Sequence, residues 1–396
     1  MLLTSFSVEN YRAFSRQQNI AIRPLTLFFG WNSGGKSALV RFLPLLAESI
    51  RVATLPIWLA GDVGRQATWS ELVCKSTKLL LLRFALHWEQ MPSLSAEWEV
   101  RGELNGGWQA IQSLSTTVGS SQRSFNMLEE ERAWTGLVPC MDANDAAKED
   151  IRHLKMGLDQ LATQVQWISG VRVRPPRIAL SSGGALPMLR PDGSDAVDHL
   201  IKAQLRSTED PLLEITRRFF RALGEQLTLD NPVDGGWRLL LSPVGASKVS
   251  VNLCDTGEGY AQVLPVLVAL AFARIGGPRL LCLEQPELHL HTHAQTELAN
   301  LLVESAQDQT KPSILVETHS EVLLMSVQLA IAEGKITPDM VRVYWVESRP
   351  DGTSDAIPVD FDDQGRPTST ALIGAFNEAV RLGRELMTNQ LSRKLS

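Results

Sequence analysis

One eight-residue segment constrains the fold of this chain more than any other part of the sequence. Residues Gly30–Ser37 read GWNSGGKS and satisfy the pattern G-x-x-x-x-G-K-[ST]. The apolar run PLTLFF precedes the segment, and a stretch of helical composition follows it until Pro44. A strand, a glycine-rich loop and a helix in this order form a phosphate-binding loop, because backbone N–H groups of the loop and of the helix start surround phosphate oxygens. The segment therefore predicts an α/β nucleotide-binding domain.

The side chains of this loop predict the ligand. A lysine at this place reaches the outer phosphates of a nucleotide, and a hydroxyl after it ligates the accompanying Mg²⁺. Lys36 and Ser37 occupy those places, so ATP and Mg²⁺ are the expected cofactors, with Ser37 as a metal ligand. The residues expected to contact the nucleotide are Gly30, Asn32, Ser33, Gly34, Gly35, Lys36 and Ser37.

A second apolar run ends in an acid. Leu280–Leu283 is followed by Glu284, as in a buried parallel strand that delivers a carboxylate to Mg²⁺. The next residue, Gln285, has an amide that orients water but does not take its proton at neutral pH. Glu287 is the nearest alternative base in the sequence. The sequence therefore leaves open whether the chain hydrolyses ATP slowly or only binds it.

Two further elements complete the pattern. Gly257 and Gly259 lie at a predicted helix start, where backbone N–H groups are available to an anion. His319 follows a third apolar strand, where it would hydrogen-bond a γ-phosphate; a histidine satisfied within the core is the other interpretation. After Asp255 the chain alternates helix, strand, helix and strand, which predicts a parallel sheet with crossover helices.

In this order, the four elements resemble the ABC-type ATPase heads of the RecF, SMC and OLD group. Within that group the chain is most similar to stand-alone prokaryotic AAA-type ATPases that lack a Toprim nuclease and are often found in phage-defence or DNA-maintenance operons. The segment VENYRAF, at residues 8–14, is similar to the N-terminal strand of the group. The resemblance implies an α/β, ABC-ATPase-like P-loop NTPase head with a mixed central sheet, an antiparallel β subdomain and a helical insertion.

The resemblance also implies roles for individual residues. Gly30–Ser37 would be the Walker A loop, Glu284 the Walker B acid and metal ligand, and His319 the switch histidine. Gly257–Gly259 would belong to the signature that contacts ATP bound to another subunit, so a homodimer with shared ATP sites is implied. The residues expected to take part in catalysis are Glu284, Gln285, Glu287 and His319. Arg12 is expected near the nucleotide, and Gln66 is a Q-loop candidate by position only.

Three functions are compatible with these features. The first is a nucleotide-gated dimeric switch that controls a separately encoded effector, either a nuclease or a toxin, in prokaryotic anti-phage defence. The second is a RecF-like repair or recombination ATPase that binds DNA directly. The third is a scaffold that binds ATP without hydrolysing it.

Periodicity and turn residues predict three regions. Residues 1–109 are expected to form the N-terminal part of the ATPase head, 110–235 a mainly helical insertion, and 236–396 the C-terminal part. Hairpins are expected in SAEWEVRGELNGGWQAIQSL, turning at Asn105–Gly107, and in GWRLLLSPVGASKVSVNL. An amphipathic helix is expected in PLLEITRRFFRALG, and a last helix in STALIGAFNEAVRLGRELM.

Composition narrows the range of partners. The formal net charge is −6, so the chain as a whole is not an electrostatic nucleic-acid binder, and DNA would need a local basic patch. The four cysteines form no CxxC pair, which argues against a zinc site and a disulfide framework and favours the cytoplasm. No signal peptide and no apolar run of membrane-spanning length are visible, so no membrane contact is expected.

Two clusters of charged side chains allow more than one interpretation. The alternating histidines of ELHLHTH would line one face of an extended segment and bind metal, although the family resemblance places them in a loop that enters a helix. The basic segments are solvated surface or a partner or nucleic-acid contact. The residues concerned are His289, His291 and His293 in the first cluster, and Arg172, Arg174, Arg177, Arg217, Arg218 and Arg221 in the second.

Overall fold

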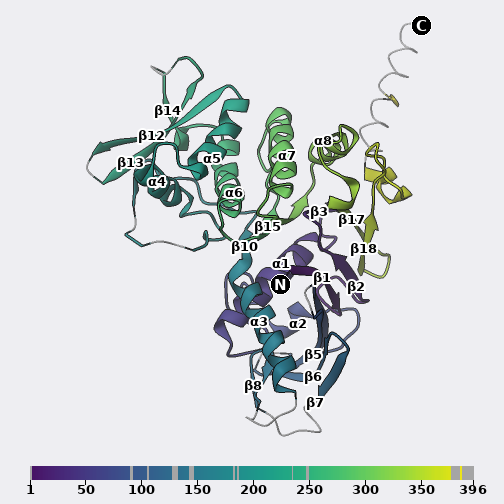
Figure 1. Ribbon diagram of the computed structural model, residues 1–396. Coiled ribbons are helices and arrows are strands. Elements are labelled where there is room, and N and C mark those ends of the chain that lie inside the picture. The colour runs from purple at the N-terminus through teal and green to yellow at the C-terminus, as the bar shows by residue number, and fades with distance from the viewer. Residues whose placement is uncertain are drawn as a thin grey trace, which may run out of the picture.

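The computed structural model divides into an upper tier and a lower lobe (Figure 1). It describes residues 2–89, 92–104, 107–126, 133–141, 147–181, 183–184, 187–233, 235–246, 249–375 and 384–385. In Figure 1 the helices α4 to α8 stand in the upper tier, and the lower lobe holds an antiparallel sheet covered by α3. A mixed sheet and the helix α1 (Lys36–Val52) lie where the two parts meet.

The mixed sheet positions the phosphate loop. Its strand order is β10-β15-β16-β3-β17-β18, in which the first five strands are parallel and β18 is antiparallel to β17. The strands are β3 (Leu25–Gly30), β10 (Val165–Ile168), β15 (Leu280–Glu284), β16 (Ser313–Thr318), β17 (Val341–Ser348) and β18 (Ser354–Val359). Because β16 lies between β3 and β15, the carboxyl ends of all three strands meet beside the loop that follows β3.

The antiparallel sheet forms a second layer on the other side of α1. Its order is β2-β1-β4-β5-β6-β7, and β4 and β5 alternate buried with more exposed side chains. The strands are β1 (Leu2–Glu9), β2 (Gln18–Ala21), β4 (Leu81–Glu89), β5 (Leu94–Gly102), β6 (Gln109–Val118) and β7 (Ser121–Asn126). The buried face of this sheet packs with α1, with α2 (Trp69–Leu72) and with α3 (Lys148–Gln164) in one apolar core.

A second apolar core covers the opposite face of the mixed sheet. It contains buried side chains from five helices, and α6 is buried along most of its length, as expected for the apolar run VLPVLVALAFA. The helices are α4 (Ala196–Arg206), α5 (Pro211–Ala222), α6 (Glu258–Arg274), α7 (Thr292–Ala306) and α8 (Glu321–Ala332). That run contains no charged side chain that would have to stay in water, which explains why the helix lies within a core.

The remaining elements are short. A small antiparallel sheet at the left of Figure 1 has the order β11-β13-β12, with β14 paired to β13. Its strands are β11 (Ala179–Leu180), β12 (Glu225–Val233), β13 (Gly236–Pro243) and β14 (Val251–Asn252). The other short elements are β8 (Trp134–Thr135), β9 (Val138–Pro139), η1 (Leu253–Asp255), η2 (Pro338–Met340) and η3 (Thr370–Ala375).

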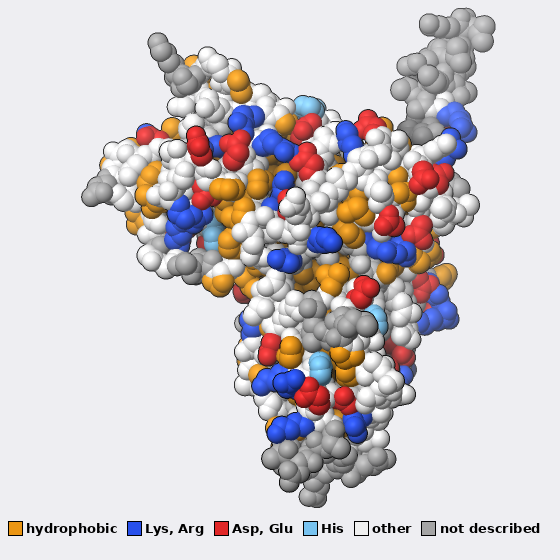
Figure 2. Space-filling model, viewed as in Figure 1, with side chains coloured by type: hydrophobic (Ala, Val, Ile, Leu, Met, Phe, Trp, Pro, Cys, Tyr) orange, Lys and Arg blue, Asp and Glu red, His pale blue; other side chains and the backbone are white. Residues whose placement is uncertain are grey.

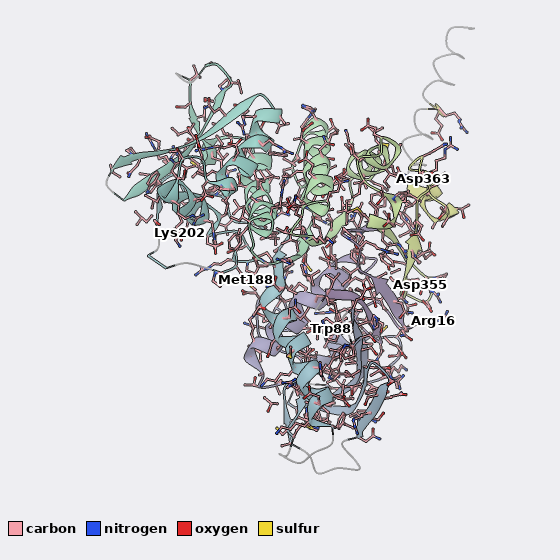
Figure 3. All side chains as sticks on the ribbon, in the orientation of Figure 1. Arg16, Trp88, Met188, Lys202, Asp355 and Asp363 are labelled. Carbon is pink, nitrogen blue, oxygen red and sulfur yellow. The ribbon has the colours of Figure 1, made fainter. Side chains whose placement is uncertain are left out.

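A segment near the start of the chain joins residues 354–356 in one head. Ser354 N donates a hydrogen bond to the Ala13 carbonyl at 2.9 Å, and Ala356 N donates to Gln18 Oε1 at 2.8 Å. Figure 3 shows Arg16 and Asp355 together at the edge where these segments meet. The segment that resembles the N-terminal strand of the RecF, SMC and OLD group is therefore fixed to the last strand of the mixed sheet.

The predicted elements can be compared with this architecture. The predicted mixed sheet and antiparallel β subdomain are both present. Residues 110–235, expected to be mainly helical, contain α3, α4 and α5 but also β6, β7 and β12, and their strand β10 lies in the mixed sheet. The expected boundaries therefore cut through sheets, because strand pairing joins segments that are distant in sequence.

Both predicted hairpins are paired as expected. β5 pairs with β6 and β13 with β14, each antiparallel. Two residues of the first turn, Asn105 and Gly106, lie outside the described residues, and so does most of the predicted last helix. Among the helices in the described ranges, none has both the length and the apolar character that crossing a membrane requires.

Candidate functional site

The loop between β3 and α1 has the geometry of an anion site. Gly30 and Gly35 have φ values of 149° and 98°, which an L-residue rarely adopts, and a Cβ at Gly30 would lie 2.2 Å from the Val346 carbonyl oxygen. Helix α1 has neither a capping side chain nor an acid in its first turn, unlike α8, which Ser320 caps. The first N–H groups of α1 therefore remain available to phosphate oxygens.

Lys36 points into this loop. Its Nζ donates to the carbonyl oxygens of Gly30 at 3.0 Å and Trp31 at 2.6 Å, and the residue is only 3% exposed. Burial lowers the pKa of Lys36, while the charge of Glu317 raises it. The ammonium group is therefore held by backbone dipoles at the place where the predicted phosphates would lie.

Glu284 ends β15 at the same edge of the sheet, and its carboxylate is fully engaged. Arg41, from α1, donates to both oxygens at 2.5 Å, and Trp167 Nε1 donates to Oε1 at 2.7 Å. The Arg41 guanidinium also lies 5.8 Å from the centroid of the Trp167 ring. The predicted Walker B acid is thus the centre of a compact polar cluster behind the phosphate loop.

A second carboxylate, which the sequence analysis missed, contacts the phosphate loop directly. Glu317 of β16 is the register partner of Glu284, and its Oε1 accepts a hydrogen bond from Ser37 Oγ at 2.7 Å. Its Oε2 is buried and has no hydrogen-bond partner in the described part of the chain. Burial, together with the charge of Glu284, raises the pKa of Glu317. The available sequence signal was an acid near the end of the strand that leads to His319.

Gln285 follows β15 in a left-handed backbone conformation, with φ at 41°. Its N–H donates to the Glu317 carbonyl at 2.8 Å, and its own carbonyl accepts from Arg172 at 2.9 Å. Its side-chain oxygen lies 3.9 Å from where a Cβ on Gly170 would be. Gln285 is therefore fixed through its backbone at the edge of the sheet that carries both carboxylates.

Glu287 is buried beside the end of β16. Its Oε1 accepts from Thr318 Oγ1 at 2.7 Å and from the backbone N–H of His319 at 3.1 Å. Burial raises the pKa of Glu287. These contacts favour a role in positioning His319 over the role of general base.

His319 lies beside the phosphate loop, as the sequence predicted. Its ring lies near the Gly30 carbonyl, which also accepts from Lys36. Burial and the nearby Lys36 charge lower the pKa of His319. The ring is therefore favoured in its neutral form, in which it both donates and accepts hydrogen bonds.

Gly257 and Gly259 lie at the start of α6. Gly257 is the N-cap of α6, and both glycines line a surface pocket of about 280 Å³. The three histidines of ELHLHTH line the same pocket, whereas none of Gly30–Ser37 does. Among the residues that the structure describes, no three His, Cys, Asp or Glu side chains are arranged to hold a metal ion, so the histidine segment forms no such site there.

The basic segment at 172–177 is not a free surface cluster. Arg172 is buried and donates to the carbonyls of Gln262, Glu284 and Gln285. Arg174 pairs with Glu258, and Arg177 makes two hydrogen bonds to Asp255. The solvated-surface interpretation is therefore wrong for Arg172, because the segment folds over the start of α6 and its arginines fix that helix.

The second basic segment is also paired within the chain. Arg217 donates to the Thr208 carbonyl at 2.8 Å, Arg218 pairs with Glu304, and Arg221 pairs with Glu214. These pairs leave fewer uncompensated charges for a nucleic acid than the sequence suggested.

Arg12 and Gln66 make no hydrogen bond to the phosphate loop among the described residues. Arg12 Nη1 donates to the Glu71 carbonyl at 2.8 Å. Phe14, two residues later, packs against the loop, because its ring would lie 3.0 Å from a Cβ built on Gly35. The Arg12 segment therefore supports the phosphate loop. Gln66 is exposed, with φ at 58°.

The side chains at this edge of the sheet fit ATP and Mg²⁺. Mg²⁺ prefers oxygen ligands, and Ser37, Glu284 and Glu317 bring a hydroxyl and two carboxylates together. The unpartnered, buried Oε2 of Glu317 is the observation that most favours a bound cation. When bound, Mg²⁺ would neutralise charge on the outer phosphates; Lys36 would bind those phosphates, and His319 would donate to them.

Comparison with known proteins agrees with this architecture. A sequence family described as "AAA domain, putative AbiEii toxin, Type IV TA system" matches residues 246–326, which contain α6, β15, α7 and β16. No curated protein matches the chain.

Two solved SMC heads share the fold across nearly the whole chain. An SMC head bound to the C-winged helix domain of ScpA superposes with a TM-score of 0.54 at 12% identity, covering 91% of this chain and 98% of that one. An SMC head with an extended coiled coil, bound to the C-terminal domain of ScpA derived from Pyrococcus furiosus, gives 0.51 at 11% identity, covering 98% and 99%. The chain thus has the fold of an ABC-like, SMC-type ATPase head.

Proposed function

We propose that this chain binds ATP with Mg²⁺, hydrolyses it slowly and acts as a nucleotide-gated dimeric switch. The observation that carries the proposal is the convergence of Lys36, Ser37, Glu284, Glu317 and His319 at one edge of the mixed sheet. These residues lie in or directly after two neighbouring strands, β15 and β16, and at the start of helix α1. Their ammonium, hydroxyl, carboxylate and imidazole groups suit a triphosphate with its metal ion.

Slow turnover is expected because neither Gln285 nor Glu287 is placed to act as a general base. Gln285 has no carboxylate to take a proton, and Glu287 is engaged by Thr318 and His319. A positioned general base contributes roughly 10²–10⁴-fold in rate. Without one, proton loss would depend on phosphate or solvent, and ATP-bound dimers would live long enough to act as a signal.

The positions of the phosphate loop and of Gly257 and Gly259, the two halves of the proposed shared site, support a dimer. Gly257 and Gly259 line a surface pocket to which none of Gly30–Ser37 contributes, so we infer that they contact ATP bound to a second subunit. Trp31, in the phosphate loop, is 60% exposed, although it contacts Trp345 edge to face. An apolar ring at the mouth of a nucleotide site is suited to being covered by a second subunit.

A separately encoded effector is proposed as the output of the switch. The matching family description refers to a toxin of a toxin–antitoxin system, and the two similar SMC heads are bound to domains of ScpA, which supports a partner protein for this fold. A prokaryotic anti-phage role would be one use of such a pair.

Direct DNA binding in the manner of RecF is the second candidate. It requires a basic surface, but the arginines at 172–177 and 217–221 are paired within the chain. On the face shown in Figure 2, basic and acidic side chains of the described residues alternate rather than gather into one band. These observations favour the switch.

Steady-state phosphate release, measured together with ATP affinity by calorimetry, tests the proposal. Gln285→Glu should accelerate turnover by less than about 10²-fold, because the surrounding side chains do not position a new charge as a base. Glu284→Ala should be nearly inactive, and Lys36→Ala should lose ATP binding. Loss of all turnover in Glu287→Gln, with His319 still ordered, would instead identify Glu287 as the base.

ATP binding without phosphate release from any variant would favour the scaffold function. Unchanged ATP affinity in Lys36→Ala would refute the phosphate-loop assignment itself.

A further inference from the structure

The proposed site contains two carboxylates that are candidates for the metal ligand. Glu284 and Glu317 are neighbours across β15 and β16, so both reach the same edge of the sheet. They differ in what already surrounds them, and that difference assigns separate roles to them.

Glu284 has little capacity left for a cation. Arg41 occupies both of its oxygens, Trp167 donates to Oε1, and the Gly170 N–H approaches Oε2 at 3.4 Å. A guanidinium bound to both oxygens of a carboxylate is among the stronger polar contacts in proteins. A metal ion at Glu284 would have to displace Arg41 from a carboxylate that is only 3% exposed.

Glu317 has the free capacity that Glu284 lacks. Its Oε1 is bound to Ser37, the residue whose hydroxyl a phosphate loop uses for Mg²⁺, and its Oε2 is unpartnered among the described residues. The side chain is 4% exposed, so water from the bulk does not satisfy that oxygen. A buried carboxylate oxygen without a donor is costly, which points to a ligand that is bound there during function.

We propose that Glu317, together with the Ser37 hydroxyl, supplies the protein ligands that contact Mg²⁺ directly, and that Glu284 stays in its ion pair with Arg41. This inference rests on the proposed ATP–Mg²⁺ site and changes the assignment of its carboxylate. Glu284 then acts through Arg41 and Trp167, which it holds behind the phosphate loop. Gln285 is fixed to the same strand end, because its N–H donates to the Glu317 carbonyl.

Metal binding measured without turnover separates the two acids. Mn²⁺ can replace Mg²⁺, and its binding in the presence of ADP can be titrated by electron paramagnetic resonance for the wild type, Glu317→Gln and Glu284→Gln. The two variants are matched, since each exchanges one carboxylate for an amide of the same shape. Outer contacts of a metal site alter affinity by about 10–100-fold, so loss of a direct ligand should weaken Mn²⁺ binding at least about tenfold.

The expected result is this loss in Glu317→Gln, with a smaller change in Glu284→Gln. ADP affinity in the presence of a chelator should stay the same or rise in Glu317→Gln, because a negative charge near the phosphates is removed. Glu317→Asp keeps the charge but shortens the reach, so it should bind Mn²⁺ more weakly than the wild type does; it serves as the test if the amide variant fails to fold.

The inference is overturned if Glu284→Gln loses Mn²⁺ and Glu317→Gln retains it, or if the two variants lose it equally. If the wild type binds nucleotide and Mn²⁺ and both Glu317→Gln and Glu317→Asp bind them equally well, this inference is refuted but the proposed function is not. If the wild type binds no nucleotide, both are refuted.

Discussion

Replacing Arg172 with methionine should destabilise the protein far more than the same change two residues away. Arg172 bridges three carbonyls, those of Gln262, Glu284 and Gln285, and is 5% exposed. Arg174 lies in the same segment, but both it and its partner Glu258 are almost half exposed. The pair of substitutions therefore compares a buried arginine with an exposed one in nearly the same sequence context.

The magnitude follows from opposing effects. Burial lowers the pKa of Arg172 from 12.5 to about 10, which corresponds to about 3 kcal/mol for keeping the buried group charged at neutral pH. Hydrogen bonds from a charged donor contribute about 1.5–3 kcal/mol each, and Arg172 makes three. The net contribution to the free energy of unfolding is then about 2–5 kcal/mol. The exposed pair at Arg174 is worth about 0–1 kcal/mol.

Urea unfolding monitored by circular dichroism measures this difference, provided that the slope of the transition is the same in each protein. Arg172→Lys should recover only part of the loss, because one ammonium group does not reach three carbonyls in the geometry of a planar guanidinium. Equal destabilisation by Arg172→Met and Arg174→Met, or none by Arg172→Met, would refute the network described for Arg172.

Two other predictions concern the dimer and the pH dependence of stability. A Cβ at Gly257 would meet no atom within 4 Å, and the backbone conformation there suits any residue, so Gly257→Leu should fold normally. The variant should nevertheless lose the ATP–Mg²⁺-dependent dimer, as measured by light scattering. A dimer that still forms would contradict the split site. Burial lowers the pKa of His199, so the unfolded chain binds more protons as the pH falls. The stability from neutral His199 is therefore fully present above its unfolded pKa of about 6.5 and is lost as the pH falls from there through the lower folded pKa. His199→Phe should therefore lose less stability between about pH 7.5 and about pH 5.5 than the wild type, and an unchanged pH dependence of the urea midpoint would contradict this assignment.

Local sequence predicted those parts of the site whose residues are close in the chain. The phosphate loop requires only a strand, glycines and a helix in succession, and each signal is visible within 24–44. The same holds for β15, α7 and β16, where apolar runs of strand length alternate with a helical pattern. The signal for His319 was likewise local, because the histidine directly follows a strand.

Contacts between segments that are distant in the sequence could not be predicted from such local patterns. Arg41 reaches Glu284 across 243 positions, and Glu317 reaches Ser37 across 280. Both pairs depend on the strand order β15-β16-β3, which places β16 beside the phosphate-loop strand. The burial of Arg172 was not predicted for the same reason, since it depends on how a loop folds over α6 and not on its neighbours in sequence.

The contacts of Arg172 also connect the two halves of the proposed split site within one subunit. The arginine joins α6, which begins at Gly257, to the carbonyls of Glu284 and Gln285. Gln285 is in a left-handed conformation that costs a non-glycine residue about 1–3 kcal/mol, so it persists only while its neighbours hold it. Arg172 is one of those neighbours, because its guanidinium holds the Gln285 carbonyl while it also binds the Gln262 carbonyl of α6. The position of α6 and the backbone conformation of Gln285 are therefore coupled through one buried side chain.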